Sequence, residues 1–407
     1  MTRSEPPLDE PVRRRLLRQR QGVEPTTSTE LFFDLVYIFT VTQLSHYLIE
    51  HPTWRGAART GLLLALVWFV WVYTAWVTNW LQPDQAPVRA LLLALMLGSL
   101  LLSAAIPEAF GETGLLFALV YVAVQVGRTA FGLWAVQGHP WLSGGFQKTL
   151  LWFGGTSALM VLGGLAGAGV REALWGAAIL LELIGLSTGY PVPRLGRSRT
   201  EQWEVEGGHL AERCQAFILI ALGESILVTG STLAQRLDLE TSGAFVLAFA
   251  GSVALWWVYF ARSAPAATAV IARAGTRTGG LSRVAFNYLH PVMVAGIIVT
   301  AAADERLLRE PGAPTGTLTA LFTLGGPALF LAGHGAYKAV LWRARPTSRL
   351  VAVVVLLALM PVCVGLAVPV AVCAALATAV TVAVIVADRF RVRAQRSVVA
   401  GPRSPLR

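Results

Sequence analysis

Long apolar blocks constrain the fold of this chain more than any other feature. A helix needs about 20 apolar residues to cross the hydrocarbon region of a bilayer. Backbone polar groups find no water there, so helices satisfy them and open sheets do not. The sequence predicts about twelve spans, at roughly 31–49, 61–81, 88–106, 113–137, 148–168, 171–190, 210–234, 242–264, 284–302, 316–341, 350–368 and 370–387. We therefore predict an all-α, polytopic transmembrane helix bundle.

The charged residues are distributed as membrane topology requires. Only 14% of the residues are charged, although the net charge is +10. Loops that follow even-numbered spans carry arginines such as Arg343 and Arg345, whereas the opposite loops carry Glu108, Glu112 and the mixed run 304–306. An excess of Lys and Arg marks cytoplasmic loops. The pattern predicts that both termini are cytoplasmic, and it argues against nucleic acid as a partner.

Matching features in the two halves indicate an internal repeat. Glu30 opens span one as Glu212 opens span seven, and both halves have a Trp- and Tyr-rich second span. Six spans per half make the copies parallel, with a substrate site expected where they meet. The predicted parts are a basic N-terminal segment (1–30), a first six-helix repeat (31–190), a linker (191–209), a second six-helix repeat (210–388) and a basic tail (389–407).

An acidic motif lies where span one enters the membrane. On a helix, Glu30, Asp34 and Tyr37 share one face. Carboxylates at such a place are costly and need a partner or a function. Glu30 is equally consistent with stabilising the positive helix N-terminus, with Ser28 or Thr29 as the capping residue. Asp34 lies deeper, which favours a functional role or a structural ion pair over capping.

Span seven carries the second polar cluster. His209, Glu212 and Arg213 lie at its start, and Glu224 with Ser225 lies near mid-membrane. A buried carboxylate at that depth suits proton exchange or cation coordination. The alternative is a structural hydrogen bond to a neighbouring span. Because spans one and seven would face each other as inner helices, we predict that both clusters form one ion- or substrate-binding region.

Other intramembrane residues have structural explanations as well. Arg128 and Glu182 are predicted at similar depth, so a structural ion pair is expected. Aromatic residues in spans two and eight form either interfacial belts or the lining of a cavity or pore. The deeper ones considered for a lining role are Trp71, Tyr73, Trp256 and Tyr259.

Several classes of site are not expected. Cys214, Cys363 and Cys373 fall inside spans without metal-ligand or disulfide spacing, and are interpreted as packing residues. The sequence has no nucleotide-binding loop, no nucleophile elbow and no zinc-protease motif. We therefore predict no catalytic residue, no metal site and no cofactor.

Three motifs together resemble a known family. The run from Glu30 to Asp34, the run from His209 to Arg213 and the run from Ala221 to Ser225 are similar to the bacterial low temperature requirement A (LtrA) family. The resemblance covers nearly the whole chain. It implies a multi-pass protein of the bacterial cytoplasmic (inner) membrane, linked by name to growth in the cold, and it implies no assigned reaction.

A second similarity concerns the entry to span one. Phe33-Asp34, in a chain of two six-span halves, is similar in part to the endolysosomal potassium channels and their bacterial relatives. There a Phe-Ser-Asp motif opens the pore-lining helix of each repeat. This resemblance implies a pore role for spans one and seven, although the second half has Glu212-Arg213 and no corresponding Asp.

The leading functional prediction is a transporter or channel for a small ion or solute that uses buried carboxylates. One alternative is a membrane-embedded enzyme acting on a lipid or prenyl-linked substrate, and another is a structural or sensory membrane protein. The expected partners are the lipid bilayer and a small ion or solute. The oligomeric state is left open, with a homodimer as one form considered.

Overall fold

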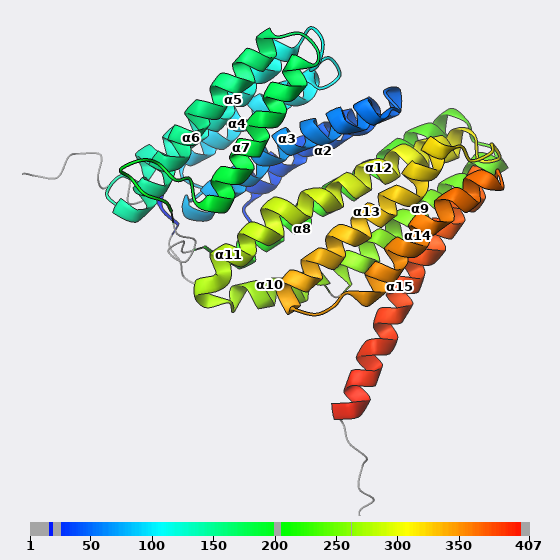
Figure 1. Ribbon diagram of the computed structural model, residues 1–407. Helices are drawn as coiled ribbons and strands as arrows, with labels where there is room; N and C mark the ends of the chain where they lie inside the picture. The colour runs from blue at the N-terminus through cyan, green and yellow to red at the C-terminus, as the bar shows by residue number, and fades with distance from the viewer. Residues whose placement is uncertain (1–15, 19–25, 199–204, 262, 400–407) are drawn as a thin grey trace, which may run out of the picture. The chain divides into compact units, whose positions relative to one another are not determined.

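The computed structural model describes residues 16–18, 26–198, 205–261 and 263–399 (Figure 1). Within these residues the chain is helical and forms no β-strand. The long helices are α2 (Ser28–Glu50), α3 (Trp54–Trp80), α4 (Ala86–Ala105), α5 (Gly114–Ala135), α6 (Pro140–Leu165), α7 (Val170–Thr188), α8 (Gly207–Gln235), α9 (Leu239–Phe260), α12 (His290–Arg309), α13 (Thr317–Trp342), α14 (Thr347–Gly365) and α15 (Val370–Val399). Between α9 and α12 lie the shorter α10 (Ser263–Ala272), η2 (Gly275–Arg277), α11 (Thr278–Ser282) and the π-helical η3 (Arg283–Leu289).

Each predicted span coincides with one of the long helices, which confirms the all-α polytopic prediction. Across the described residues, ten helical stretches are long and apolar enough to cross a membrane. The two predicted spans outside that set are α6 and α7. Glycines lower the mean hydropathy of α6, and α7 carries Arg171, Glu172 and Glu182.

One expected loop is helical. The sequence assigns Asp304 and Glu305 to a loop, but α12 continues to Arg309. The assignment was wrong because a charged run resembles a loop in a hydropathy pattern. Both side chains are buried, at 7% exposure.

The described chain packs as two compact units. The first is Met1–Ala221 with Ala267–Pro291, and the second is Leu222–Ala266 with Val292–Arg407. The division therefore falls inside α8. The predicted repeat and its boundaries stay a prediction, and much of the predicted terminal segments and residues 199–204 of the linker lie outside the described residues.

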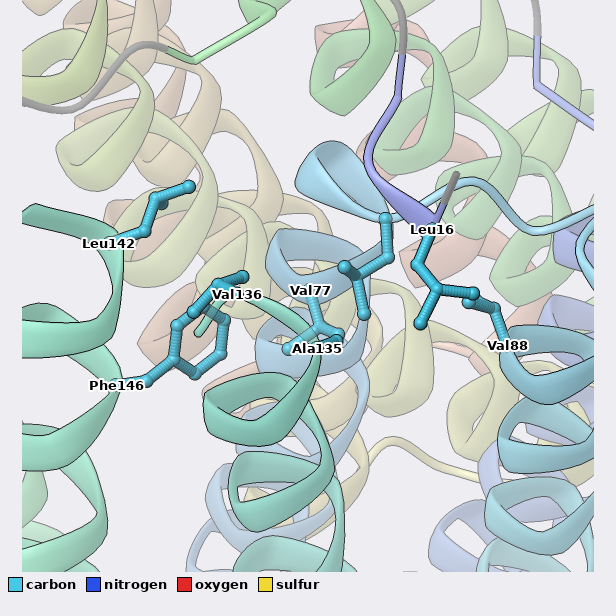
Figure 2. Packing of buried hydrophobic residues seen from close by; sticks show 8 residues of the cluster. Leu16, Val77, Val88, Ala135, Val136, Leu142 and Phe146 are labelled. Atoms are coloured by element: carbon cyan, nitrogen blue, oxygen red, sulfur yellow. The ribbon is translucent and has the colours of Figure 1, made fainter. Parts of the chain in front are cut away.

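The first unit is built on α2 to α7. Helix α2 packs against α3 and α4, and α4, α5, α6 and α7 pack successively. The segment at residues 16–18 pairs with the end of α3: Arg18 N–H donates to Trp80 O at 2.9 Å, and Gln82 N–H donates to Leu16 O at 2.8 Å. Figure 2 shows Leu16 among apolar side chains of α3, α4, α5 and α6. These contacts hold residues 16–18 against the end of α3.

The second unit packs α9 against α15, and α13 against α14 and α15. Helices α12 and α13 approach most closely at two glycines. A Cβ on Gly296 would lie 2.5 Å from Phe330 N, and one on Gly326 would lie 2.5 Å from Thr300 Oγ1. Small residues at such crossings bring helix backbones into contact, which is a common way for membrane helices to associate.

Candidate functional site

The first turn of α2 is closed by a capping box between Thr27 and Glu30. Glu30 N–H donates to Thr27 Oγ1 at 3.3 Å, and Thr27 N–H donates to Glu30 Oε2 at 3.0 Å. This arrangement satisfies two backbone donors that have no partner within the helix. The capping residue is thus Thr27. The expectation of Ser28 or Thr29 was wrong because the helix already begins at Ser28.

The Glu30 carboxylate also contacts three basic side chains. His209 Nε2 lies 2.9 Å from Oε1, Arg18 Nη2 lies 3.3 Å from Oε2, and Arg213 Nη1 lies 3.7 Å from Oε1. All four side chains are at most 1% exposed. Glu30 is therefore both a capping residue and the acidic centre of a buried ionic cluster.

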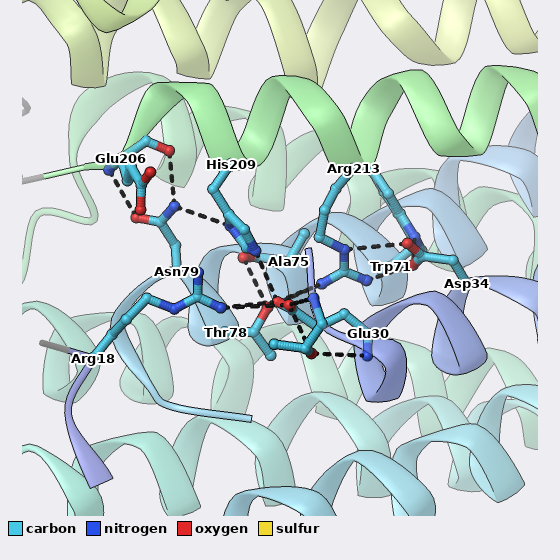
Figure 3. A network of polar contacts seen from close by, with 11 residues as sticks. Arg18, Glu30, Asp34, Trp71, Ala75, Thr78, Asn79, Glu206, His209 and Arg213 are labelled. Atoms are coloured by element: carbon cyan, nitrogen blue, oxygen red, sulfur yellow. Dashed lines mark hydrogen bonds and ion pairs between the residues drawn. The ribbon is translucent and has the colours of Figure 1, made fainter. Parts of the chain in front are cut away.

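Asp34 forms the second ion pair of the cluster, with Arg213. The Arg213 Nε–H donates to Oδ2 at 3.2 Å, and Nη2–H donates to Oδ1, so the guanidinium meets the carboxylate with two donors (Figure 3). Trp71 Nε1–H donates to the same Oδ1 at 2.7 Å. Two-donor contacts between Arg and a carboxylate fix orientation as well as adding energy. The structure thus places Asp34 in an ion pair and not at the helix cap.

Helical spacing explains why these side chains meet. Glu30 and Asp34 are four residues apart on α2, and His209 and Arg213 are four residues apart on α8, so each pair occupies one face of its helix. Glu30 contacts His209, and Asp34 contacts Arg213. An acidic face of α2 therefore lies against a basic face of α8.

Helix α3 supplies neutral groups to the same cluster. Arg213 Nη1–H donates to Thr78 Oγ1 at 2.9 Å. Asn79 Nδ2–H donates to Glu206 O at 2.9 Å, while Glu206 N–H donates to Asn79 Oδ1 at 3.0 Å. The Arg213 guanidinium carbon also lies 5.7 Å from the ring centroid of Trp71. Sequence reasoning missed Thr78 and Asn79 as cluster residues, although an adjacent Thr and Asn at the end of an apolar, aromatic span was a usable signal.

The cluster is balanced in charge. Two carboxylates, Glu30 and Asp34, face two guanidinium groups, Arg18 and Arg213, with His209 alongside. Buried charges are expensive unless paired and hydrogen-bonded. Each acid here has at least one basic partner, so the arrangement can hold its charges away from water and can change if one carboxylate gains a proton or another ligand.

Two predicted members of the region that belong to the first unit, Tyr37 and Glu212, lie outside the cluster. Tyr37 is buried, and its hydroxyl is 3.1 Å from Ser99 Oγ on α4. Glu212 is only partly buried, unlike its neighbour Arg213. The structure therefore gathers Glu30, Asp34, His209 and Arg213, and it adds Arg18, which sequence reasoning had left in the N-terminal segment.

Glu224 and Ser225 belong to the second unit. Both are buried on α8. Ser225 Oγ–H donates to Asp304 Oδ2 at 3.1 Å and lies 3.2 Å from Ser252 Oγ. Asp304 also lines a small cavity between α9, α12, α13 and α15. Asp304 is thus a buried acid of the second unit that sequence reasoning missed because it was assigned to a loop.

Arg128 and Glu182 are joined through other side chains and not by the direct ion pair that the sequence favoured. Arg128 Nη2–H donates to Gln125 Oε1, and Gln125 Nε2–H donates to the Tyr121 hydroxyl at 3.1 Å. The Tyr121 hydroxyl in turn donates to the Glu182 carboxylate at 3.0 Å. We call this series of hydrogen bonds from Arg128 to Glu182 the α5–α7 relay.

The four aromatic candidates have different surroundings. Trp71 is fully buried in the ionic cluster, and Tyr73 is buried with its hydroxyl against that of Tyr190. Tyr259 is buried, with its ring centroid 6.1 Å from that of His334. Trp256 is 39% exposed. The exposure of Trp256 favours the membrane-facing interpretation for that residue.

Metal-ligand geometry is not present in the part of the chain that the structure describes, where no group of three or more His, Cys, Asp or Glu side chains is placed to hold a metal ion. The three cysteines are buried.

Comparison with known proteins places the chain in a family. The family described as bacterial low temperature requirement A protein (LtrA) matches residues 26–386. An uncharacterized protein of Rhizobium meliloti (strain 1021) is 38% identical over 323 residues, which is 79% of this chain and 77% of that protein. No solved structure matches.

Proposed function

The chain belongs to the bacterial low temperature requirement A (LtrA) family, and we propose that it is a membrane transport protein, a transporter or a channel, for a small ion or solute. The observation that carries the proposal is the α2–α8 ionic cluster, in which Asp34 and Arg213 meet with both side chains at most 1% exposed. Ionisable residues within membrane segments are rare and mark substrate or ion pathways more often than other positions do.

The cluster has the elements of a two-state contact. A proton or small cation on Asp34 weakens its attraction for Arg213. Arg213 then keeps Thr78 at 2.9 Å and Glu30 at 3.7 Å as partners. Because the guanidinium does not lose all its contacts, the Asp34 pair can open at a lower cost than an isolated buried pair. A ligand that favours the open state shifts this equilibrium by its differential affinity for the two states.

Glu224 and Ser225 extend the proposal to the second unit. Glu224 is buried on the helix that carries Arg213, and Ser225 contacts Asp304. We assign Glu224 to the binding of the transported ion or of a coupled proton. Asp304 adds a second acid to this region.

The proposal includes the arrangement in the membrane. Cytoplasmic termini are supported by the distribution of charge, with Arg343 and Arg345 in a loop on one side and Glu108 and Glu112 in a loop on the other. Family membership supports the bacterial inner membrane. The Trp- and Tyr-rich spans α3 and α9 support two parallel six-helix repeats. Lipid or prenyl chemistry, the alternative from the sequence, has less support, because the acids of the cluster are engaged with bases of the same chain.

Ion flux in proteoliposomes tests the proposal. The purified full-length chain is reconstituted with a pH-sensitive dye inside, and the collapse of an imposed pH gradient is followed with sodium, potassium or chloride gradients in turn. We expect the wild type to exceed protein-free vesicles with at least one ion. Asp34→Asn and Glu224→Gln should each reduce that rate at least tenfold, because each removes a titratable carboxylate.

The matched control is Asp84→Asn. Asp84 is also a carboxylate, but its side chain is 59% exposed in a pair with Arg89, so its flux should stay within twofold of the wild type. Wild-type rates in both the Asp34 and the Glu224 variants would contradict the residue assignments. No flux above protein-free vesicles with any of these ions would contradict small-ion transport.

A further inference from the structure

The first unit contains a cavity with aromatic walls, separate from the ionic cluster. Its volume is about 70 Å³, and it lies between α3, α5, α6 and α7. Its walls include Tyr73, Trp76, Trp80, Phe146 and Tyr190. Ligand pockets have this character, with mostly apolar and aromatic walls and few polar groups.

Arg128 brings a positive charge into these walls. Its side chain is 1% exposed, and its hydrogen bonds go to neutral acceptors, including Val70 O at 3.1 Å and Gln125 Oε1. The Nε–H has no hydrogen-bond partner. Glu182 is reached only through the α5–α7 relay. A buried cation with an unused donor beside an apolar cavity is suited to an anionic group on an apolar body.

We propose that this cavity binds a single-chain amphiphile with one carboxylate, of which a long-chain fatty acid is the simplest. Arg128 is the only charged side chain among the residues described as lining the cavity. One guanidinium matches one carboxylate, whereas a phosphate monoester carries close to two negative charges and calls for a second cation. The aromatic walls accept the hydrocarbon chain.

The α6 wall provides the entrance. Trp141, Gly145 and Thr149 line the cavity at intervals of four residues, so they share one face of α6. Trp141 is 41% exposed, and the other two are partly exposed. A fatty acid dissolved in the bilayer therefore reaches Arg128 past this face. This inference does not depend on the transport function proposed above.

Competitors that share a hydrocarbon chain but differ in head group test whether the ligand needs a negative charge, without altering the protein. Binding of tritiated palmitate to the full-length chain in lipid nanodiscs is measured against empty nanodiscs, with unlabelled competitors. We expect saturable binding that palmitate displaces at least tenfold better than hexadecanol and at least threefold better than hexadecyl phosphate. Equal displacement by hexadecanol would overturn the role of Arg128. Tighter binding of the phosphate would overturn the carboxylate, and absence of saturable binding would overturn the site.

Two adjacent glycines test the location. A Cβ added at Gly144 or Gly145 meets no atom within 4 Å, so the backbone of α6 leaves room for the start of a side chain at either position. Only Gly145 lines the cavity. We expect Gly145→Leu to weaken palmitate binding at least tenfold and Gly144→Leu to leave it within twofold. Equal affinities in the two variants would place the ligand elsewhere.

Discussion

The first unit accommodates buried charges in two different ways. In the α2–α8 cluster, acids and bases touch, as Asp34 and Arg213 do. In the α5–α7 relay, Arg128 and Glu182 are each surrounded by neutral hydrogen-bonding groups. The comparison shows that direct contact makes a charge depend on the oppositely charged side chains it touches, whereas a relay spreads that dependence over several neutral bonds.

The same helical spacing underlies both solutions. The cluster uses residues four apart on two helices, with opposite charges on the facing surfaces. The relay uses Tyr121, Gln125 and Arg128 along one face of α5, and its single acid comes from α7. Removing a charge should therefore cost more in the cluster than in the relay.

The largest effect is expected for Arg213→Gln. This change leaves Asp34 buried without its direct cation and removes one basic neighbour of Glu30. Breaking a buried pair from one side costs about 3–5 kcal/mol. We expect the free energy of unfolding in detergent or lipid to fall by that amount, measured by equilibrium unfolding monitored through tryptophan fluorescence.

Two further variants check the cause of this loss. Adding Asp34→Asn to Arg213→Gln should recover part of the stability, because no uncompensated charge remains at that pair. Arg236→Gln removes an arginine whose side chain is 67% exposed in its pair with Asp238, and should change stability by less than about 1 kcal/mol. If the double variant lost more unfolding free energy than the two single variants lose together, direct pairing would be refuted as the source.

A smaller effect is expected for Glu182→Gln. The amide keeps the size of the side chain and one acceptor oxygen for Tyr121 or Thr156. Hydrogen bonds to a charged acceptor are worth about 1 kcal/mol more than neutral ones, so the two donors together predict a loss of about 2 kcal/mol. The same unfolding measurement applies. A loss equal to that of Arg213→Gln would show that the relay acts as a direct ion pair.

The sequence predicted the helices well because each span is a local pattern of hydropathy. It also predicted that acids of span one and bases of span seven lie at corresponding ends. It did not predict which atoms meet, since partner choice depends on how helices pack. Arg128 illustrates this, because an ion pair with Glu182 was reasonable at equal depth, yet Gln125 and Tyr121 lie between them.

Residues missed by the sequence share a physical reason. Arg18 lies in a short segment whose position depends on backbone pairing with Trp80 and Gln82. Asp304 lies in a charged run that hydropathy assigns to a loop, although α12 continues through it. A search for two acids four residues apart on one span and two bases four residues apart on another would have found the core of the cluster. It would not have found Arg18 or Asp304.

The smallest effect is expected for Trp71→Phe, which sharpens the comparison within the cluster. The side chain stays aromatic, although smaller, while the Nε1–H donated to Asp34 Oδ1 at 2.7 Å is lost. A hydrogen bond to a charged group contributes about 1.5 kcal/mol at the low end of its range. Trp175→Phe is the matched control, because Trp175 is equally buried and donates to the neutral Met160 O at 3.0 Å. Trp175→Phe should lower the free energy of unfolding, measured by equilibrium unfolding, by about 1 kcal/mol or less. A larger loss in Trp175→Phe than in Trp71→Phe would mean that the charge on Asp34 adds nothing to its hydrogen bond with the indole.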